Sequence, residues 1–154
     1  MNTTNVMTLD AKRASKKRVA SKNHLNNGFD KAYILQGEIF FSLNRFKEAL
    51  EAFDKALLVN PKNTKALACK AQIYDMQNIN EKALECINLA LQYTNSEDSE
   101  FLASLFDQKL DILNKINDKN SIISTLILAQ KVLPCKDYSY LNSFYENKPN
   151  LIAL

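Results

Sequence analysis

Glycine and proline are scarce in this chain of 154 residues, which contains two glycines and three prolines. Because tight turns depend on these residue types, their scarcity disfavours hairpin-rich all-β folds. The two glycines, Gly28 and Gly37, also cannot build a glycine-rich phosphate-binding loop. The chain is nonetheless about one domain in length, which is enough to bury a core.

Residues that commonly carry chemistry are equally few. His24 is the single histidine and lies among asparagines in a basic segment, where a solvated loop position is expected. The cysteines, Cys69, Cys86 and Cys135, lack metal-ligand spacing and indicate reduced thiols inside the cell. Cys69 and Cys86 fall in expected helices, where packing is favoured over a nucleophilic role. We therefore predict a protein that is not an enzyme and needs no cofactor or metal.

Long apolar runs are also absent. No apolar stretch approaches the length of a membrane-spanning helix, and the N-terminus lacks the apolar region of a secretory signal. We therefore expect an intracellular, cytoplasmic protein with no membrane span.

Charge is unevenly distributed along the chain. Residues 1–29 hold six lysines or arginines and one acid, a net charge of +5, whereas residues 30–154 carry a net charge of −2. The body therefore gives no electrostatic reason to expect nucleic acid. We predict that residues 1–29 form a disordered, solubilising arm. The alternatives are a nuclear-import signal, an organelle-targeting segment, and an RNA or ribonucleoprotein contact through residues 12–22.

An internal repeat is the main positive feature. When residues 30–63 are laid over residues 64–97, apolar positions coincide, and several also match in size. The coinciding pairs are Tyr33/Leu67, Gly37/Ala71, Phe40/Tyr74, Ala49/Ala83, Phe53/Ile87 and Ala56/Ala90. A repeat of this length predicts stacked supersecondary units.

Each unit has the pattern of two short amphipathic helices. Apolar residues recur at helical spacing on both sides of a break at Asn44 and Arg45. Asn60 precedes Pro61, which predicts the end of the second helix. Asn63 and Thr64 then offer side-chain oxygens that would cap the next helix.

A third unit fits when residues 103–136 are laid over residues 64–97, which leaves a short insertion between the second and third units. Leu110 and Ile122 then occupy positions that hold small residues in the earlier units, so we expect wider or shifted packing there. Residues 95–100 are rich in asparagine, serine and acids, which would cap and lengthen the first helix of this unit.

The repeats resemble the tetratricopeptide repeat (TPR) family. Residues 30–63 and 64–97 resemble the motif well, although Asn95 replaces the usual proline, and residues 103–136 resemble it loosely. The resemblance implies an all-α solenoid of three helix-turn-helix repeats. Residues 137–147 would add a capping helix, with Tyr140 and Phe144 covering the last repeat, so that the TPR domain spans 30–147 and a tail spans 148–154.

This resemblance also implies a concave, partner-binding surface on the first helix of each unit. Positions left over after assigning the core should line it. They are Lys31, Ile34, Glu38 and Phe41 in the first unit, Lys65, Ala68, Gln72, Asp75 and Met76 in the second, and Asp107 and Asp111 in the third. A peptide or helix with apolar anchors and a basic side chain would complement this surface.

Family members that clamp acidic chaperone C-termini use paired lysine, asparagine and arginine residues on these helices. The corresponding positions here hold none of them: Ile34, Glu38, Cys69, Ser104 and Gln108. We therefore predict a scaffold or adaptor that binds another protein but not such a chaperone tail. A small secretion or assembly chaperone of the TPR type is the further alternative.

Overall fold

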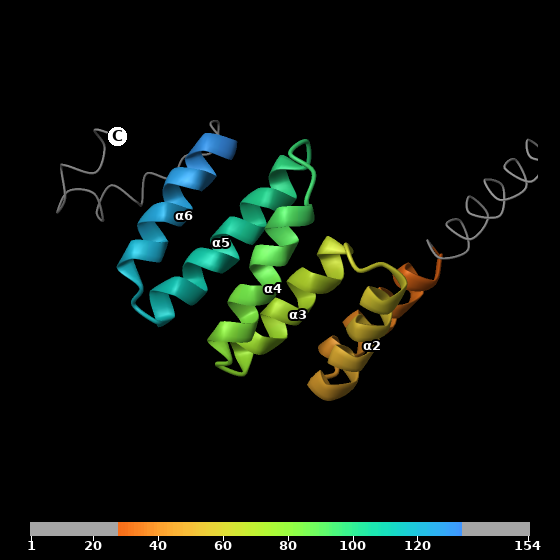
Figure 1. The fold of residues 1–154 in the computed structure, drawn as a ribbon. Coiled ribbons are helices and arrows are strands. Elements are labelled where there is room, and N and C mark those ends of the chain that lie inside the picture. The colour runs from red at the N-terminus through yellow and green to blue at the C-terminus, as the bar shows by residue number, and fades with distance from the viewer. Residues whose placement is uncertain (1–27, 134–154) are drawn as a thin grey trace, which may run out of the picture. The chain divides into compact units, whose positions relative to one another are not determined.

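A computed structural model describes residues 28–133, and these residues form six helices and no strand (Figure 1). The first helix is described over residues 28–42. It is followed by α2 (Phe46–Val59), α3 (Thr64–Met76), α4 (Asn80–Tyr93), α5 (Ser99–Lys115) and α6 (Lys119–Val132). The predicted all-α fold of three helix pairs is confirmed. The predicted capping helix at 137–147, the tail at 148–154 and residues 1–27 of the predicted arm lie outside the described residues.

The chain divides into two compact units, Met1–Cys69 and Lys70–Leu154. The first contains the helix at residues 28–42, α2 and the first turns of α3. The second contains the rest of α3 together with α4, α5 and α6.

The turn inside each helix pair is built in the same way three times. Asn44, Asn78 and Asn117 have left-handed backbone conformations, with φ of 58°, 58° and 56°. In the first turn the Asn44 N–H donates to the Phe41 carbonyl and the Arg45 N–H donates to the Phe40 carbonyl, both at 2.9 Å. This pattern is the Schellman motif, and it recurs around the other two asparagines. The three asparagines coincide when the predicted repeats are laid over one another, which confirms both predicted offsets.

Close packing of the first helix against α2 depends on a glycine. A Cβ atom added at Gly37 would lie 2.5 Å from Cε1 of Phe53, whose side chain is fully buried. Three alanines on α2, Ala49, Ala52 and Ala56, are also buried. Small residues therefore let the two helices approach closely enough to enclose the Phe53 ring.

A buried carboxylate joins the first helix to the loop that ends its repeat. Asp30 is 4% exposed, and its Oδ2 accepts hydrogen bonds from Nδ2 of Asn60 at 3.2 Å and of Asn63 at 3.0 Å. Asn63 also caps α3, because its Oδ1 accepts from the Ala66 N–H at 3.0 Å. The capping role predicted for Asn63 is confirmed, and the same side chain also holds Asp30.

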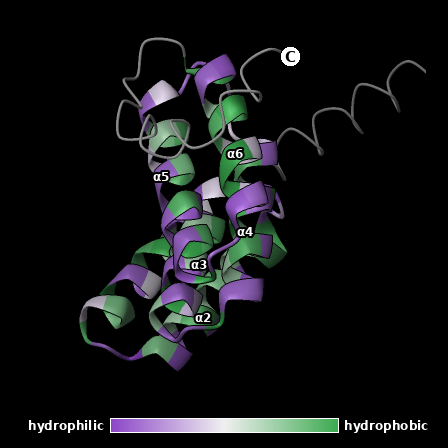
Figure 2. Cartoon of the chain, turned by 90° about the vertical axis from the view of Figure 1, so that its left-hand side faces the viewer, coloured by the Kyte–Doolittle hydropathy of each residue, from purple (hydrophilic) through white to green (hydrophobic). Residues whose placement is uncertain are grey.

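In the second unit α5 packs against both α4 and α6. Its buried residues form a hydrophobic cluster with residues of α6, and Leu84 and Leu91 of α4 pack against that cluster. Leu110 and Ile122, the large residues at normally small positions, both lie in it. Each helix carries hydrophobic residues next to hydrophilic ones (Figure 2).

The acidic segment before α5 caps that helix as predicted. The Asp98 carboxylate accepts a hydrogen bond from the Phe101 N–H at 3.3 Å. The helix that follows, α5, is 17 residues long, and each of α2, α3, α4 and α6 is shorter. Asp118 caps α6 in the same way, accepting from the Ser121 N–H at 3.1 Å. The pKa of Asp118 is lowered by a hydrogen bond with the Ser121 side chain and by the backbone N–H groups of Ser121 and Asn120.

We expect the substitution Gly37→Ala to destabilise the protein. Alanine in a helix gains about 1 kcal/mol over glycine, but overpacking a filled core costs typically about 1–3 kcal/mol. The contact with Phe53 should therefore outweigh the helical gain, and urea unfolding should show a lower midpoint. Gly28→Ala is the matched control, because a Cβ there meets nothing within 4 Å. A rise in stability for both variants would contradict the packing argument.

We expect Asn44→Ala to lower the free energy of unfolding by about 1 kcal/mol, because a left-handed conformation is unfavourable for a residue with a Cβ and no local hydrogen-bonding side chain. Asn44→Gly should leave stability unchanged or raise it. Asn88→Ala, at an exposed position within α4, serves as the control and should not destabilise. Equal losses in the alanine and glycine variants at position 44 would show that backbone conformation is not the cause.

Candidate partner-binding surface

The predicted binding residues differ in their exposure. Lys31, Lys65, Gln72, Met76 and Asp111 are exposed, whereas Glu38, Phe41, Ala68, Asp75 and Asp107 are half-buried. Ile34 differs from the expectation of an accessible residue, because it is 6% exposed. It lies four residues after the buried Asp30 and three before the buried Gly37, so it shares their face of the helix. Ile34 is therefore a core residue of the first unit.

Two of the predicted residues form an ion pair in the first unit. Lys65 Nζ lies 2.7 Å from Glu38 Oε1, which joins the first helix to the start of α3. The hydrogen bond from Lys65 to Glu38 raises the pKa of Lys65. Both side chains are more than a third exposed, so the pair contributes little to stability. The pair shows that these two side chains lie next to each other.

A second ion pair joins leading helices in the second unit. Lys115 Nζ of α5 contacts both carboxylate oxygens of Asp75 of α3, each at 2.7 Å. Asp75 is the more protected partner, with 17% of its side chain exposed against 48% for Lys115. Asp75 was among the residues predicted to line the surface, whereas Lys115 was not. A signal was available in the spacing of Asp111 and Lys115, which places both on one face of α5.

Phe41 was predicted to face the binding surface because Phe40 already fills a packing position. Its ring lies 5.8 Å from that of Phe46 at the start of α2, with a tilt of 54°. Phe40 in turn is covered by the Arg45 guanidinium, 4.8 Å from its ring centroid. Phe41 is thus half-buried against α2 and offers a partner only part of its ring.

The thiol of Cys69 lies beside the Glu38–Lys65 pair. Burial and the Glu38 charge raise its pKa to about 11, while the Lys65 charge acts in the opposite direction. Cys86 is buried. Both observations fit the predicted packing role, since a nucleophilic thiol requires a lowered pKa.

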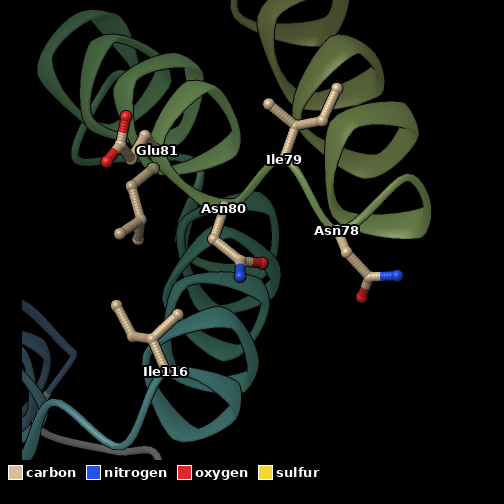
Figure 3. A pocket seen from close by; sticks show the side chains of 6 residues that line it. Asn78, Ile79, Asn80, Glu81 and Ile116 are labelled. Atoms are coloured by element: carbon tan, nitrogen blue, oxygen red, sulfur yellow. The ribbon is translucent and has the colours of Figure 1, made fainter.

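A hollow of about 560 Å³ lies in the second unit. It is lined by the turn between α3 and α4, by Glu81 and Leu84, and by Ile116 at the end of α5. Asn80 and Ile116 extend toward the same space (Figure 3). Oδ1 of Asn80 is buried without a hydrogen-bond partner. The walls are mainly apolar, and the hollow contains no pair of groups suited to acid–base chemistry.

Among residues 28–133, no group of three or more histidines, cysteines and carboxylates could hold a metal ion. No helix in the same range is both long and apolar enough to cross a membrane.

Comparison with known sequences gives one family and one relative. Residues 30–63 match the tetratricopeptide repeat family. Over 47 residues the chain is 53% identical to tetratricopeptide repeat protein 36 of Caenorhabditis elegans. This match covers 30% of the chain and 26% of the relative, so the chain spans about a quarter of that protein's length.

Two solved structures share the fold. The N-terminal domain of stress-induced protein-1 from C. elegans superposes with a TM-score of 0.67 at 17% identity, covering 76% of this chain and 92% of that one. YrrB, described as a TPR protein with an unusual peptide-binding site, has a TM-score of 0.53 at 22% identity, covering 65% of this chain and 49% of that one. At these identities the similarity shows the fold.

We expect alkylation of Cys69 to report its raised pKa. At pH 8 its thiolate should be about 100-fold scarcer than for a thiol with the ordinary pKa of 9.0, because the pKa lies near 11. In a Cys86→Ser/Cys135→Ser background, Glu38→Gln should speed alkylation because it removes a negative charge. Glu85→Gln, an exposed position on α4, is the control. Identical rates in the Glu38→Gln and control variants would contradict the electrostatic contribution.

Proposed function

We propose that this chain, in which residues 30–63 form a tetratricopeptide repeat within a TPR fold, is a non-enzymatic scaffold that binds a peptide or helix of a partner protein. Proteins built from this repeat generally mediate protein–protein interactions, and stacked repeats provide extended binding surfaces. We propose that the binding residues lie on the leading helices, which are the first helix of each repeat. Of the predicted residues, all except the buried Ile34 remain candidates.

An excess of negative charge in the second unit is the observation that carries this proposal. Asp75, Asp107 and Asp111 lie on α3 and α5, and Lys115 of α5 is paired with Asp75. The Asp75–Lys115 contact brings the two helices together at this point. Asp111 lies four residues before Lys115, and Asp107 a further four residues back, so the three side chains follow one side of α5. We call Asp107 and Asp111 the carboxylate row. Their negative charges should attract a basic segment of a partner.

An apolar anchor is available next to the carboxylates. Met76 follows Asp75 on α3, and 53% of its surface is exposed. Methionine is flexible and polarizable, so it adapts to apolar side chains of different shapes. A peptide with a lysine or arginine close to a large apolar residue would therefore satisfy both features. YrrB, which has the same fold, is described as having a peptide-binding site, and this supports a peptide as the class of ligand.

The first unit would contribute differently. Glu38 and Lys65 pair with each other, so their charges offset, and Phe41 is half-buried. Lys31 and Ala68 complete the candidates in this unit. We therefore assign the proposed selection by charge to the second unit.

Selection from a random peptide-display library tests the proposed ligand class. We expect enriched peptides to place lysine or arginine next to a large apolar residue. Their binding, measured by fluorescence anisotropy, should weaken as salt rises, because exposed charges are screened. Enrichment of acidic peptides would exclude the proposed ligand class.

Charge removal on α5 tests the proposed surface. Asp107→Asn/Asp111→Asn should weaken binding of the selected peptide about 5- to 30-fold, the change expected for one or two kcal/mol. Glu81→Gln/Glu85→Gln removes the same charge from α4 and should leave binding unchanged. Met76→Ser should reduce affinity without reducing its dependence on salt. Equal effects of the α4 and α5 double variants would indicate that net charge, not this surface, determines binding.

A further inference from the structure

The hollow beside the turn between α3 and α4 has apolar walls from three parts of the second unit. Ile79 lies in the turn, Leu84 on α4 and Ile116 at the end of α5. Ile79 and Ile116 are 38% and 42% exposed, although both line the hollow. The volume of about 560 Å³ is within the range of about 300–1,000 Å³ that is typical of small-ligand sites. The hollow can therefore accept an apolar group of the size of a large side chain.

Two hydrogen-bond acceptors accompany these walls. Oδ1 of Asn80 is buried without a hydrogen-bond partner, and the Asn80 side chain extends toward the same space as Ile116 (Figure 3). The exposed Glu81 adds a carboxylate to the lining. An amide oxygen and an ionised carboxylate accept hydrogen bonds and do not donate them. Because a buried acceptor without a partner is unfavourable, a ligand that donates to Oδ1 would remove this cost.

The repeat register shows what the position of Asn80 holds in the first unit. Asn80 is the first residue of α4, and its counterpart is Phe46, the first residue of α2. The rings of Phe46 and Phe41 pack together, with centroids 5.8 Å apart. The counterpart of Phe41 is Asp75, which pairs with Lys115 instead. The second repeat therefore lacks both aromatic rings of the first, and the hollow lies beside one of the two substituted positions.

We propose that this hollow binds a tryptophan side chain of a partner protein, with the indole ring against the apolar walls and its N–H donating to Oδ1 of Asn80. Tryptophan supplies the aromatic area that the second repeat lacks, and its N–H donates without accepting, which matches the two acceptors. Rotation of the half-buried Asn80 side chain presents Oδ1 to the ring. Tyrosine fits less well, because the Glu81 carboxylate would repel the lone pairs of its hydroxyl oxygen.

The occupant has to come from another molecule. This chain contains no tryptophan, so neither its own terminal segments nor a second copy can supply the indole. The inference also goes beyond the proposed selection by charge. A neutral tryptophan probe is not attracted by the carboxylate row, so the failure of either proposal leaves the other standing.

An NMR titration of the ¹⁵N-labelled full chain with N-acetyltryptophanamide tests the proposal. The amide signals of residues 78–81, 84 and 116 should shift and saturate. The dissociation constant should be on the order of millimolar, because a single side chain makes few contacts. The 1-methylindole derivative, which lacks the N–H, should bind about 2- to 10-fold more weakly. N-acetylleucinamide, which is aliphatic, should bind more weakly than either.

Substitution at Asn80 tests the location. Asn80→Phe introduces the residue that the first repeat has at this position, so it should fill the hollow and abolish the saturable shifts. The helical circular dichroism should remain that of the wild type. Asn88→Phe is the matched control and should bind as the wild type does, because Asn88 is exposed on α4 and does not line the hollow. Ile116→Ser removes one apolar wall at an exposed position and should weaken binding without unfolding the protein.

Four results would overturn the proposal. The first is a wild-type protein whose signals at these residues do not shift saturably at millimolar probe, and the second is a set of shifts that lies elsewhere. The third is Asn80→Phe binding as tightly as the wild type. The fourth is equal binding of the indole probe and either its 1-methyl derivative or N-acetylleucinamide, because neither of these combines an aromatic ring with a donor.

Discussion

Each helix pair of this chain depends on one residue that adopts a left-handed backbone conformation. Without it the two helices could not turn back on each other within so few residues. Asparagine fills this position at 44, 78 and 117 in a chain that has little glycine. Asparagine tolerates the conformation better than most residues with a side chain. Because the turn fixes where each helix ends and the next begins, it also sets which residues of both helices face each other, including Gly37 and Phe53.

Features encoded locally could be predicted from the sequence. The end of α2, the cap at Asn63 and the register of the three repeats follow from near neighbours in the chain, and the structure confirms them. Interactions between distant residues could not be predicted in this way. Asp30 contacts Asn60 and Asn63, and Lys115 contacts Asp75 on another helix. Local spacing can give the face of a helix on which a residue lies, but it does not identify a partner on another element. Ile34 was placed on the binding surface because a spacing rule gives a face only to within part of a turn.

Two ion pairs lie on the first helices of the repeats before any partner binds. Glu38 pairs with Lys65, and Asp75 pairs with Lys115. These four charges are therefore already neutralised within the chain when a partner arrives. Such exposed pairs contribute little to stability. They instead fix long side chains in place, which reduces the entropy lost when a partner contacts them.

The same repeat register separates two kinds of surface. The carboxylate row lies at positions whose charge differs between the repeats. Asp107 and Asp111 correspond to the uncharged Ala68 and Gln72, which suits a role in selecting one ligand. By contrast, the position of Ile39 stays apolar in the later repeats, where Ile73 and Ile112 are fully buried, and this suits helix packing.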